Sequence, residues 1–316
     1  MTIPRQEVED FTDSDLREIY AKVEDVDVIG IEEFSDSFIE RLSENPVTSG
    51  IALPWFETED KVRLRMGEVS LIAGINGHMK STVLSQILLW AAKDQPVGLA
   101  SFEMDIEDTA KLMCKQSAAV DNVAPEYGKK FAAWLSGRFY WYRVLGGVSP
   151  IQCLGAIVAM ARRGAKVIAI DNLQFTGVTE DNERERLWFN QIIGLASAMK
   201  IHICILHHVR KPQHGGDEYV PTRFDVRGSS SLVDQVHLLM IAWHNKRRSR
   251  ILQKQEYGQP LDSRETDILQ NECDFRLIVA KQRKAPFEGS IPLYLAPGQA
   301  FKFRKTGKPP TMEWIG

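Results

Sequence analysis

The chain has 316 residues and a formal net charge of −3, which argues against a uniformly basic nucleic-acid coat protein. Hydrophobic residues make up 44% of it, enough for the core of one large domain or two modest ones. No apolar run approaches the roughly 20 residues of a membrane span, and the start, MTIPRQEVED, lacks the features of a secretory signal. Four widely spaced cysteines without a C-x-x-C pair indicate reduced thiols. We therefore expect a soluble cytoplasmic protein with no membrane contact.

Residues 1–50 are acidic and contain two short helical patterns. The first begins near Thr12 or Ser14 and continues to Tyr20. The second spaces its apolar side chains three or four residues apart, at Ile31, Phe34, Phe38 and Leu42. Neither is long enough to form a core, so we expect both to pack on the main domain or on a neighbouring subunit.

Strand and helix patterns alternate over residues 51–308. Strands are expected at 69–73, 97–102, 139–143, 167–171, 201–206, 237–243, 276–281 and 290–295, and helices at 80–92, 106–118, 150–163 and 185–199. This alternation predicts an α/β domain with a mainly parallel, twisted sheet flanked by helices, extended by antiparallel C-terminal strands. The polar stretch 246–274 is expected to be an inserted surface loop or hairpin, and residues 309–316 a C-terminal tail.

A glycine-rich turn between an apolar strand and an amphipathic helix is the most informative local feature. It follows G-x-x-x-x-G-K-[ST] from Gly74 to Ser81, except that Met79 replaces the second glycine. Backbone N–H groups and the positive end of the following helix would bind phosphate there. The expected ATP-binding residues are Gly74, Ile75, Asn76, Gly77, His78, Met79, Lys80, Ser81 and Thr82. Lys80 would contact the β- and γ-phosphates and Ser81 would hold Mg²⁺, unless the turn is an ordinary one and Lys80 a surface lysine.

Three further apolar runs end in polar side chains. VIAID delivers Asp171 to the carboxyl end of a buried strand, where a Walker B acid positions Mg²⁺. VGLASFEMD leads to Glu103, a candidate general base for the water that attacks the γ-phosphate. ICILHH ends in His208, which could hydrogen-bond the γ-phosphate and report its loss.

These side chains also have plainer interpretations. Asp171 could cap the following turn, and Glu103 could be a solvated acid near a helix N-terminus. A zinc site would have to be built from Cys204, His207, His208 and His214. Because adjacent histidines on one strand point to opposite faces, we disfavour zinc.

In their order, the motifs resemble the RecA-type motor domain of superfamily-four replicative helicases, which include DnaB, mitochondrial Twinkle and the T-odd phage primase–helicases. The motifs are GINGHMKST, LASFEMD, VIAIDNLQF, ILHHVRKP, DVRGSSSLVDQ and VAKQRKAPFEG. The resemblance covers roughly residues 50–305. It implies a RecA-like P-loop NTPase of the phage or mobile-element type. Such a protein uses ATP and Mg²⁺ to move along single-stranded DNA, in the 5′→3′ direction, and to unwind duplex.

The resemblance assigns the same roles to the P-loop pair, to the acids and to the histidine: Lys80, Ser81, Glu103, Asp171 and His208. It adds Lys281 and Arg283, in AKQRKAP, as the lysine and arginine finger that reach a neighbouring subunit's nucleotide. An arginine finger acting in trans contributes roughly 10³–10⁵ in turnover, which implies a ring, most simply a homohexamer. The plainer alternative places both cations on a solvated strand edge.

DNA binding is expected of the segment RKPQHGGDEYVPTRFDVR and of the residues directly after it. Its glycines, prolines and cations are typical of a loop that follows a nucleic-acid backbone. The expected contacts are Arg210, Lys211, Arg223, Arg227, Gly228 and Ser229. A charged loop that is merely solvated is the alternative for each of them.

Two departures from the family pattern leave other functions open. Met79 stands at a glycine position, and only residues 1–50 precede the motor, so one of their helices would have to serve as the linker that docks on the adjacent subunit. A RecA-like recombinase and a regulatory or loader ATPase that binds ATP without unwinding are the rival interpretations. A primase or another replisome protein is a further expected partner.

Overall fold

The computed structural model describes residues 30–43, 49–144, 146–210, 216–228 and 230–310. The chain divides into two compact units, Met1–Asn45 and Pro46–Gly316. In the first unit, the 3₁₀ turn η2 (Ile31–Glu33) leads into helix α2 (Ser35–Ser43), which confirms the second N-terminal helix pattern. The first pattern, from Thr12 or Ser14 to Tyr20, lies outside the described residues.

Within the described residues of the second unit, nine strands form one sheet in the order β11-β10-β9-β8-β3-β7-β6-β4-β5. The parallel strands are β3 (Val69–Gly74), β4 (Val97–Ser101), β5 (Phe139–Arg143), β6 (Val167–Asp171), β7 (His202–His208) and β8 (Leu238–His244). The antiparallel extension is β9 (Phe275–Gln282), β10 (Gly289–Ala296) and β11 (Ala300–Lys302). A separate pair, β1 (Ile51–Ala52) and β2 (Arg63–Leu64), precedes the sheet. The predicted fold class is confirmed.

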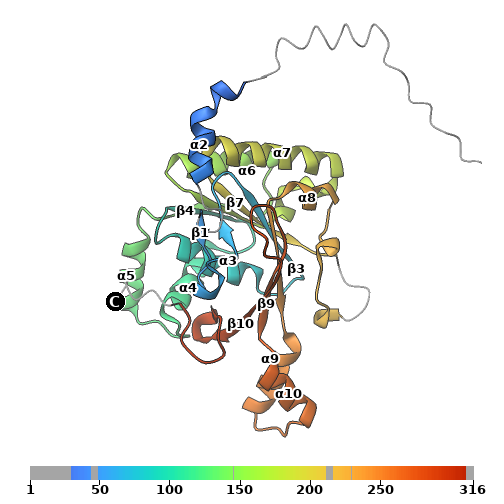
Figure 1. The fold of residues 1–316 in the computed structure, drawn as a ribbon. Coiled ribbons are helices and arrows are strands. Elements are labelled where there is room, and N and C mark those ends of the chain that lie inside the picture. The colour runs from blue at the N-terminus through green and yellow to red at the C-terminus, as the bar shows by residue number, and fades with distance from the viewer. Residues whose placement is uncertain (1–29, 44–48, 145, 211–215, 229, 311–316) are drawn as a thin grey trace, which may run out of the picture. The chain divides into compact units, whose positions relative to one another are not determined.

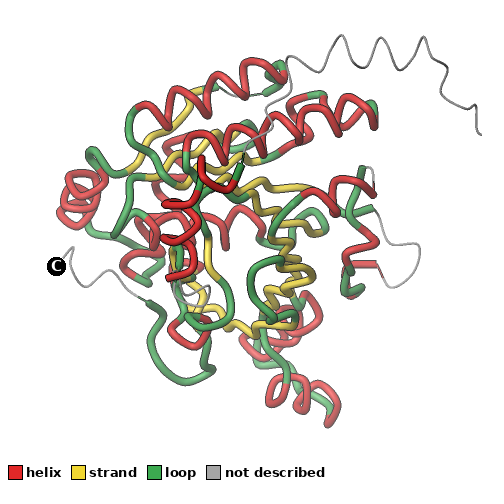
Figure 2. The backbone as a smooth tube through the Cα atoms, turned by 45° about the horizontal axis from the view of Figure 1, so that its top comes forward, coloured by secondary structure: helices red, strands yellow, loops and turns green. Residues whose placement is uncertain are grey.

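Helices cover both faces of this sheet, as Figure 2 shows. They are α3 (Lys80–Ala91), α4 (Ile106–Ala118), α5 (Pro125–Leu135), α6 (Pro150–Arg162), α7 (Asn182–Met199), α8 (Ser230–Gln235), α9 (Lys246–Glu256) and α10 (Ser263–Asn271). Short 3₁₀ turns join them: η3 (Phe56–Thr58), η4 (Leu173–Thr176), η5 (Val178–Glu180), η6 (Gly216–Glu218), η7 (Arg223–Asp225) and η8 (Pro297–Gln299). Helices α6 and α7 run side by side along one side of the sheet (Figure 1).

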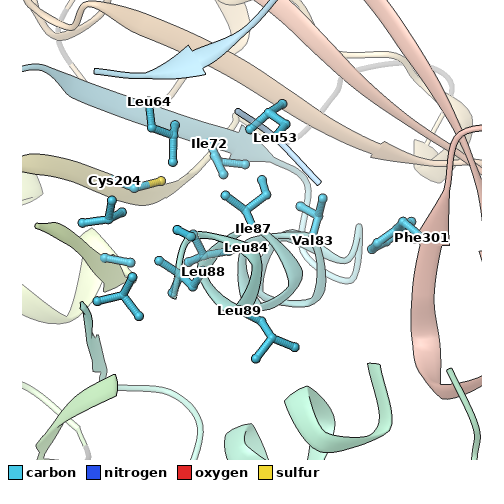
Figure 3. Close-up of a cluster of buried hydrophobic side chains, with 14 of the residues drawn as sticks. Leu53, Leu64, Ile72, Val83, Leu84, Ile87, Leu88, Leu89, Cys204 and Phe301 are labelled. Atoms are coloured by element: carbon cyan, nitrogen blue, oxygen red, sulfur yellow. The ribbon is translucent and has the colours of Figure 1, made fainter. Parts of the chain in front are cut away.

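Two hydrophobic cores result from the period-two alternation of the strands. On β3, Ile72 belongs to one core, whereas Leu71 and Ala73 belong to the other. The first core packs Ile72 against Val83, Leu84, Ile87 and Leu88 of α3 (Figure 3). The second core includes side chains of α6 and α7, such as Ile157 and Phe189. Because strands of the parallel sheet are buried on both faces, only their ends reach solvent, and these ends form the site.

The stretch 246–274 is not the predicted loop or hairpin of irregular chain, because it forms the two helices α9 and α10. Both begin with a side-chain cap: Asn245 accepts a hydrogen bond from the Arg248 N–H, and Asp262 accepts one from the Glu265 N–H. The helices project from the body of the second unit (orange in Figure 1).

A buried ion pair anchors these helices to the sheet. Arg248 Nε lies 2.7 Å from Asp274 Oδ1, and both side chains are almost wholly buried. Asp274 Oδ2 also accepts a hydrogen bond of 2.9 Å from the Leu295 N–H on β10. The α9–α10 pair is therefore a fixed part of the second unit.

Candidate functional site

The predicted nucleotide residues meet at the carboxyl ends of four adjacent strands. The register pairs Gly74 with His208, and Ser101 with Asp171. The glycine turn follows β3, and Glu103 follows β4. One cavity of about 290 Å³ is lined by Asn76, Gly77, Met79, Lys80, Ser81, Thr82, Glu103, Met104, Asp171, Asn172 and His208.

The glycine turn reaches its shape with methionine where the motif has glycine. Met79 has φ 59° and ψ 30°, and it is the residue directly before α3. Gly77 also has a positive φ, of 74°. The left-handed region suits glycine, because a Cβ atom is strained there. The Met79 side chain packs against the first hydrophobic core, which offsets part of that strain.

Lys80 is held inside the turn that it follows. Its Nζ donates to the carbonyls of Gly74, at 3.1 Å, and Ile75, at 3.2 Å. Burial lowers the pKa of Lys80 to about 8, while the carboxylates of Asp171 and Glu103 oppose this shift. A desolvated ammonium of this kind gains from an anionic ligand, because the anion restores the interactions that water would have supplied.

His208 faces Lys80 across the cavity. Its Nδ1 lies 3.4 Å from Lys80 Nζ. Burial, together with the Lys80 charge, lowers the pKa of His208 to about 4, so the ring is neutral at neutral pH. Because an ammonium can only donate, Nδ1 accepts and the ring proton lies on Nε2. His208 can therefore donate a hydrogen bond to a ligand without adding a charge.

Asp171 is the buried acid of the site. Burial raises its pKa to about 6, and Glu103 adds to this, whereas the hydrogen bond from Ser81 and the charge of Lys80 lower it. A carboxylate beside a serine hydroxyl is an oxygen donor set that fits Mg²⁺. No group of three or more metal-binding side chains gathers in the described parts of the chain.

Asn172 is a site residue that the sequence interpretation missed. Its Nδ2 donates to Glu103 Oε2 at 2.8 Å, which orients an otherwise exposed carboxylate. Its only signal in the sequence is its place directly after Asp171 in VIAIDN.

The structure does not bring Lys281 and Arg283 to this cavity. Lys281 pairs with Leu239, near the start of β8, whereas the other end of β8, at His244, hydrogen-bonds His78 of the glycine turn. Lys281 Nζ donates to the carbonyls of Val233 and Asp234 of α8, both at 2.7 Å, and the Arg283 guanidinium also donates to the Asp234 carbonyl. The two cations therefore lie at the opposite end of the sheet from their own chain's cavity.

The predicted DNA residues lie on the segment that leaves β7. Arg210, Arg223 and Arg227 are exposed, whereas Lys211 and Ser229 lie outside the described residues. The Arg227 N–H donates to the His208 carbonyl at 3.0 Å, and His207 Nε2 donates to the Arg227 carbonyl at 2.7 Å.

Gly228 fits a position that no other residue could take easily. Its φ is +100°, and a Cβ atom there would lie 2.5 Å from Glu185 Oε1. Glu185 is buried on α7, and nothing in its sequence neighbourhood indicated this contact.

The proposed zinc ligands do not converge where they are described. His207 turns to the Arg227 carbonyl and His208 to Lys80, and His214 lies outside the described residues.

Comparison with known proteins places the fold. No protein-family model matches the sequence, and no curated protein does. Among solved structures, a helicase ATPase domain superposes with a TM-score of 0.67 at 15% identity, covering 88% of this chain and all (100%) of that one. A DnaB-like replicative helicase, solved in a study of its interactions with primase, superposes with a TM-score of 0.64 at 16% identity. That match covers 92% of this chain and 71% of the other.

None of the helices in the described parts is long and apolar enough to cross a membrane. The arrangement of the sheet, with its parallel body and antiparallel C-terminal strands, agrees with these two superpositions. The chain has the RecA-like fold of the ATPase domain of DnaB-like replicative helicases.

Proposed function

We propose that the protein is an ATP-hydrolysing DNA helicase that works as a ring, moves 5′→3′ along single-stranded DNA and unwinds duplex. One observation carries the proposal. Lys80, Ser81, Glu103, Asp171 and His208 line one cavity, whereas Lys281 and Arg283 lie at the opposite end of the sheet. That is the division expected of an ATPase whose site is completed by a neighbouring copy.

Within the cavity, each residue has a distinct task. Lys80 and the N–H groups of the turn from Gly74 to Thr82 bind the phosphates. Ser81 and Asp171 hold Mg²⁺, which neutralises phosphate charge when it is bound. Glu103, oriented by Asn172, accepts the proton of the attacking water.

His208 supplies the link between the nucleotide and the DNA loop. Its Nε2–H can donate to the γ-phosphate, and its carbonyl accepts a hydrogen bond from the Arg227 N–H. Loss of the γ-phosphate removes the ring's partner, and the strand end that holds Arg227 is then free to shift.

Assembly follows from the position of the finger residues. Lys281 and Arg283 serve the nucleotide of the next subunit, and a closed ring, most simply a homohexamer, gives each site its finger. The exposed Arg210, Arg223 and Arg227 contact the DNA backbone in the channel. Because one structural neighbour was solved in a study of its primase interactions, a primase is the replisome partner to test first.

The test is steady-state ATPase activity with and without single-stranded DNA, at several protein concentrations, in wild type and Arg283→Ala. We expect stimulation by DNA, steep concentration dependence, and a loss of roughly 10³-fold or more in Arg283→Ala. Arg264→Ala, which removes an exposed arginine of α10, is the control and should match wild type. Weak wild-type activity, indifferent to DNA and to Arg283, would instead indicate a regulatory ATPase.

A further inference from the structure

The turn η7 presents an aromatic side chain to solvent beside cations. Phe224 is 78% exposed, although burying a phenyl ring is strongly favourable. The Arg223 guanidinium lies 5.0 Å from its ring centroid, and Arg227 is exposed a few residues further along. An exposed aromatic ring between cations suits a ligand with flat apolar rings on a phosphate chain.

Other exposed aromatic rings lack this setting. Phe56 is 81% exposed and Tyr257 is 72% exposed, but they directly adjoin Glu57 and Glu256, respectively. Their surroundings would repel a phosphate chain, which distinguishes Phe224 by charge and not by exposure alone.

The turn that carries Phe224 is fixed by its neighbours. Asp225 Oδ2 accepts hydrogen bonds from the Thr222 N–H at 2.7 Å, the Thr222 hydroxyl at 2.8 Å and the Tyr219 hydroxyl at 3.0 Å. The Arg210 N–H donates to the Asp225 carbonyl at 2.7 Å. A ring held in this way loses little conformational entropy when it stacks on a ligand.

The same turn is connected to the nucleotide cavity. Val226 forms a bridge with Val209, directly after His208, and the Arg227 N–H donates to the His208 carbonyl. A second cavity, of about 550 Å³, is shared by Asn76, His208, Arg210 and Arg227. A change at His208 can therefore reach Phe224 through a short run of hydrogen-bonded backbone.

We propose that Phe224 stacks on a base of single-stranded DNA, while Arg223 and Arg227 contact the flanking phosphates. The inference rests on the proposed function, because it needs DNA in the channel, and it adds a contact to the bases where only phosphate contacts were expected. The stacking is tolerant of sequence, since every base has a flat face.

The test compares two strands of equal length, oligo(dT) and a strand of abasic sites with the same phosphates, bound to the full chain with a non-hydrolysable ATP analogue. We expect Phe224→Ala to weaken binding of oligo(dT) roughly 5- to 100-fold and to leave binding of the abasic strand unchanged. Phe224→Trp should retain the wild-type preference for oligo(dT). Phe56→Ala, the equally exposed control, should change neither affinity.

Three outcomes would overturn the inference, and they differ in what they leave standing. If Phe224→Ala binds both strands as wild type does, the DNA motor remains and the stacking role is wrong. If Phe224→Ala loses both affinities together with its assembly, as measured by light scattering, Phe224 is a contact between subunits. If wild type binds neither strand, the proposed function itself fails.

Discussion

At the scale of single residues, the left-handed Met79 is where the sequence departs most from what its backbone favours. Glycine normally destabilises a chain relative to alanine by about 0.5–1 kcal/mol. At a positive φ the order reverses, because alanine carries a strain of about 1–2 kcal/mol that glycine avoids. The two substitutions at Met79 both remove the packing of its side chain, so their difference isolates the backbone term.

We therefore expect Met79→Gly to be more stable than Met79→Ala by about 1 kcal/mol in urea unfolding. As a control within a helix, Ser85→Gly should be less stable than Ser85→Ala, because its backbone is helical. If alanine were the more stable residue at position 79 as well, the left-handed conformation would not exist in solution.

The pKa of Asp171 sets a pH limit on magnesium binding. Burial raises this pKa to about 6, so the carboxylate is ionised above that pH and protonated below it. Affinity for Mg²⁺·ATP should fall about tenfold per pH unit below 6 and level off above it. Asp171→Asn has lower affinity but lacks this limb, and it serves as the control for titration of the ATP phosphates, which ionise in the same range. Equal slopes in both proteins would contradict the assignment.

Strand ends explain which site residues could be predicted. Asp171, Glu103 and His208 each follow a buried apolar run, and the carboxyl ends of parallel strands meet at one edge, so their convergence followed from pattern alone. Asn172 and the conformation of Met79 could not be predicted, because one depends on a side-chain contact to Glu103 and the other on backbone torsions.

At the scale of elements, the predicted helices and strands of the sheet are present, and the polar ones were missed. In α9 only Arg248 and Ile251 are buried, and in α10 only Ile268, so neither helix carries the apolar stripe that reveals a helix in sequence. Helix α5 buries just Phe131 and Leu135. Their caps and ion pairs hold them instead, and these depend on contacts across the fold.

The ion pair between Arg248 and Asp274 should be the strongest of these contacts. Asp274→Ala leaves a buried guanidinium without its partner carboxylate and should cost about 3 kcal/mol or more in free energy of unfolding. Lys254→Ala breaks the pair with Glu265, whose side chains are 34% and 21% exposed, and should cost no more than about 1 kcal/mol. Chemical denaturation of both variants measures the difference, and equal losses would show that Asp274 is not the anchor.

At the scale of the whole molecule, the cavity lies within one compact unit, whereas the proposed finger has to act between copies. The second unit, Pro46–Gly316, holds the turn from Gly74 to Thr82, Asp171 and His208. Binding of a nucleotide and assembly of the ring are therefore separable properties. The amphipathic helix α2, in the first unit, is the candidate for the contact that assembles the ring.

A chain that begins at Gly50 should accordingly bind Mg²⁺·ATP with wild-type affinity and yet fail to assemble, as measured by calorimetry and by light scattering on the same samples. Its ATPase activity should fall with its assembly, because Arg283 then has no neighbour to serve. Phe34→Ser together with Phe38→Ser in the full chain should reproduce this loss, since both changes remove apolar surface from α2 and the residue before it without shortening the chain. If the shortened chain forms rings as readily as the full chain, the second unit assembles by itself and α2 has another role.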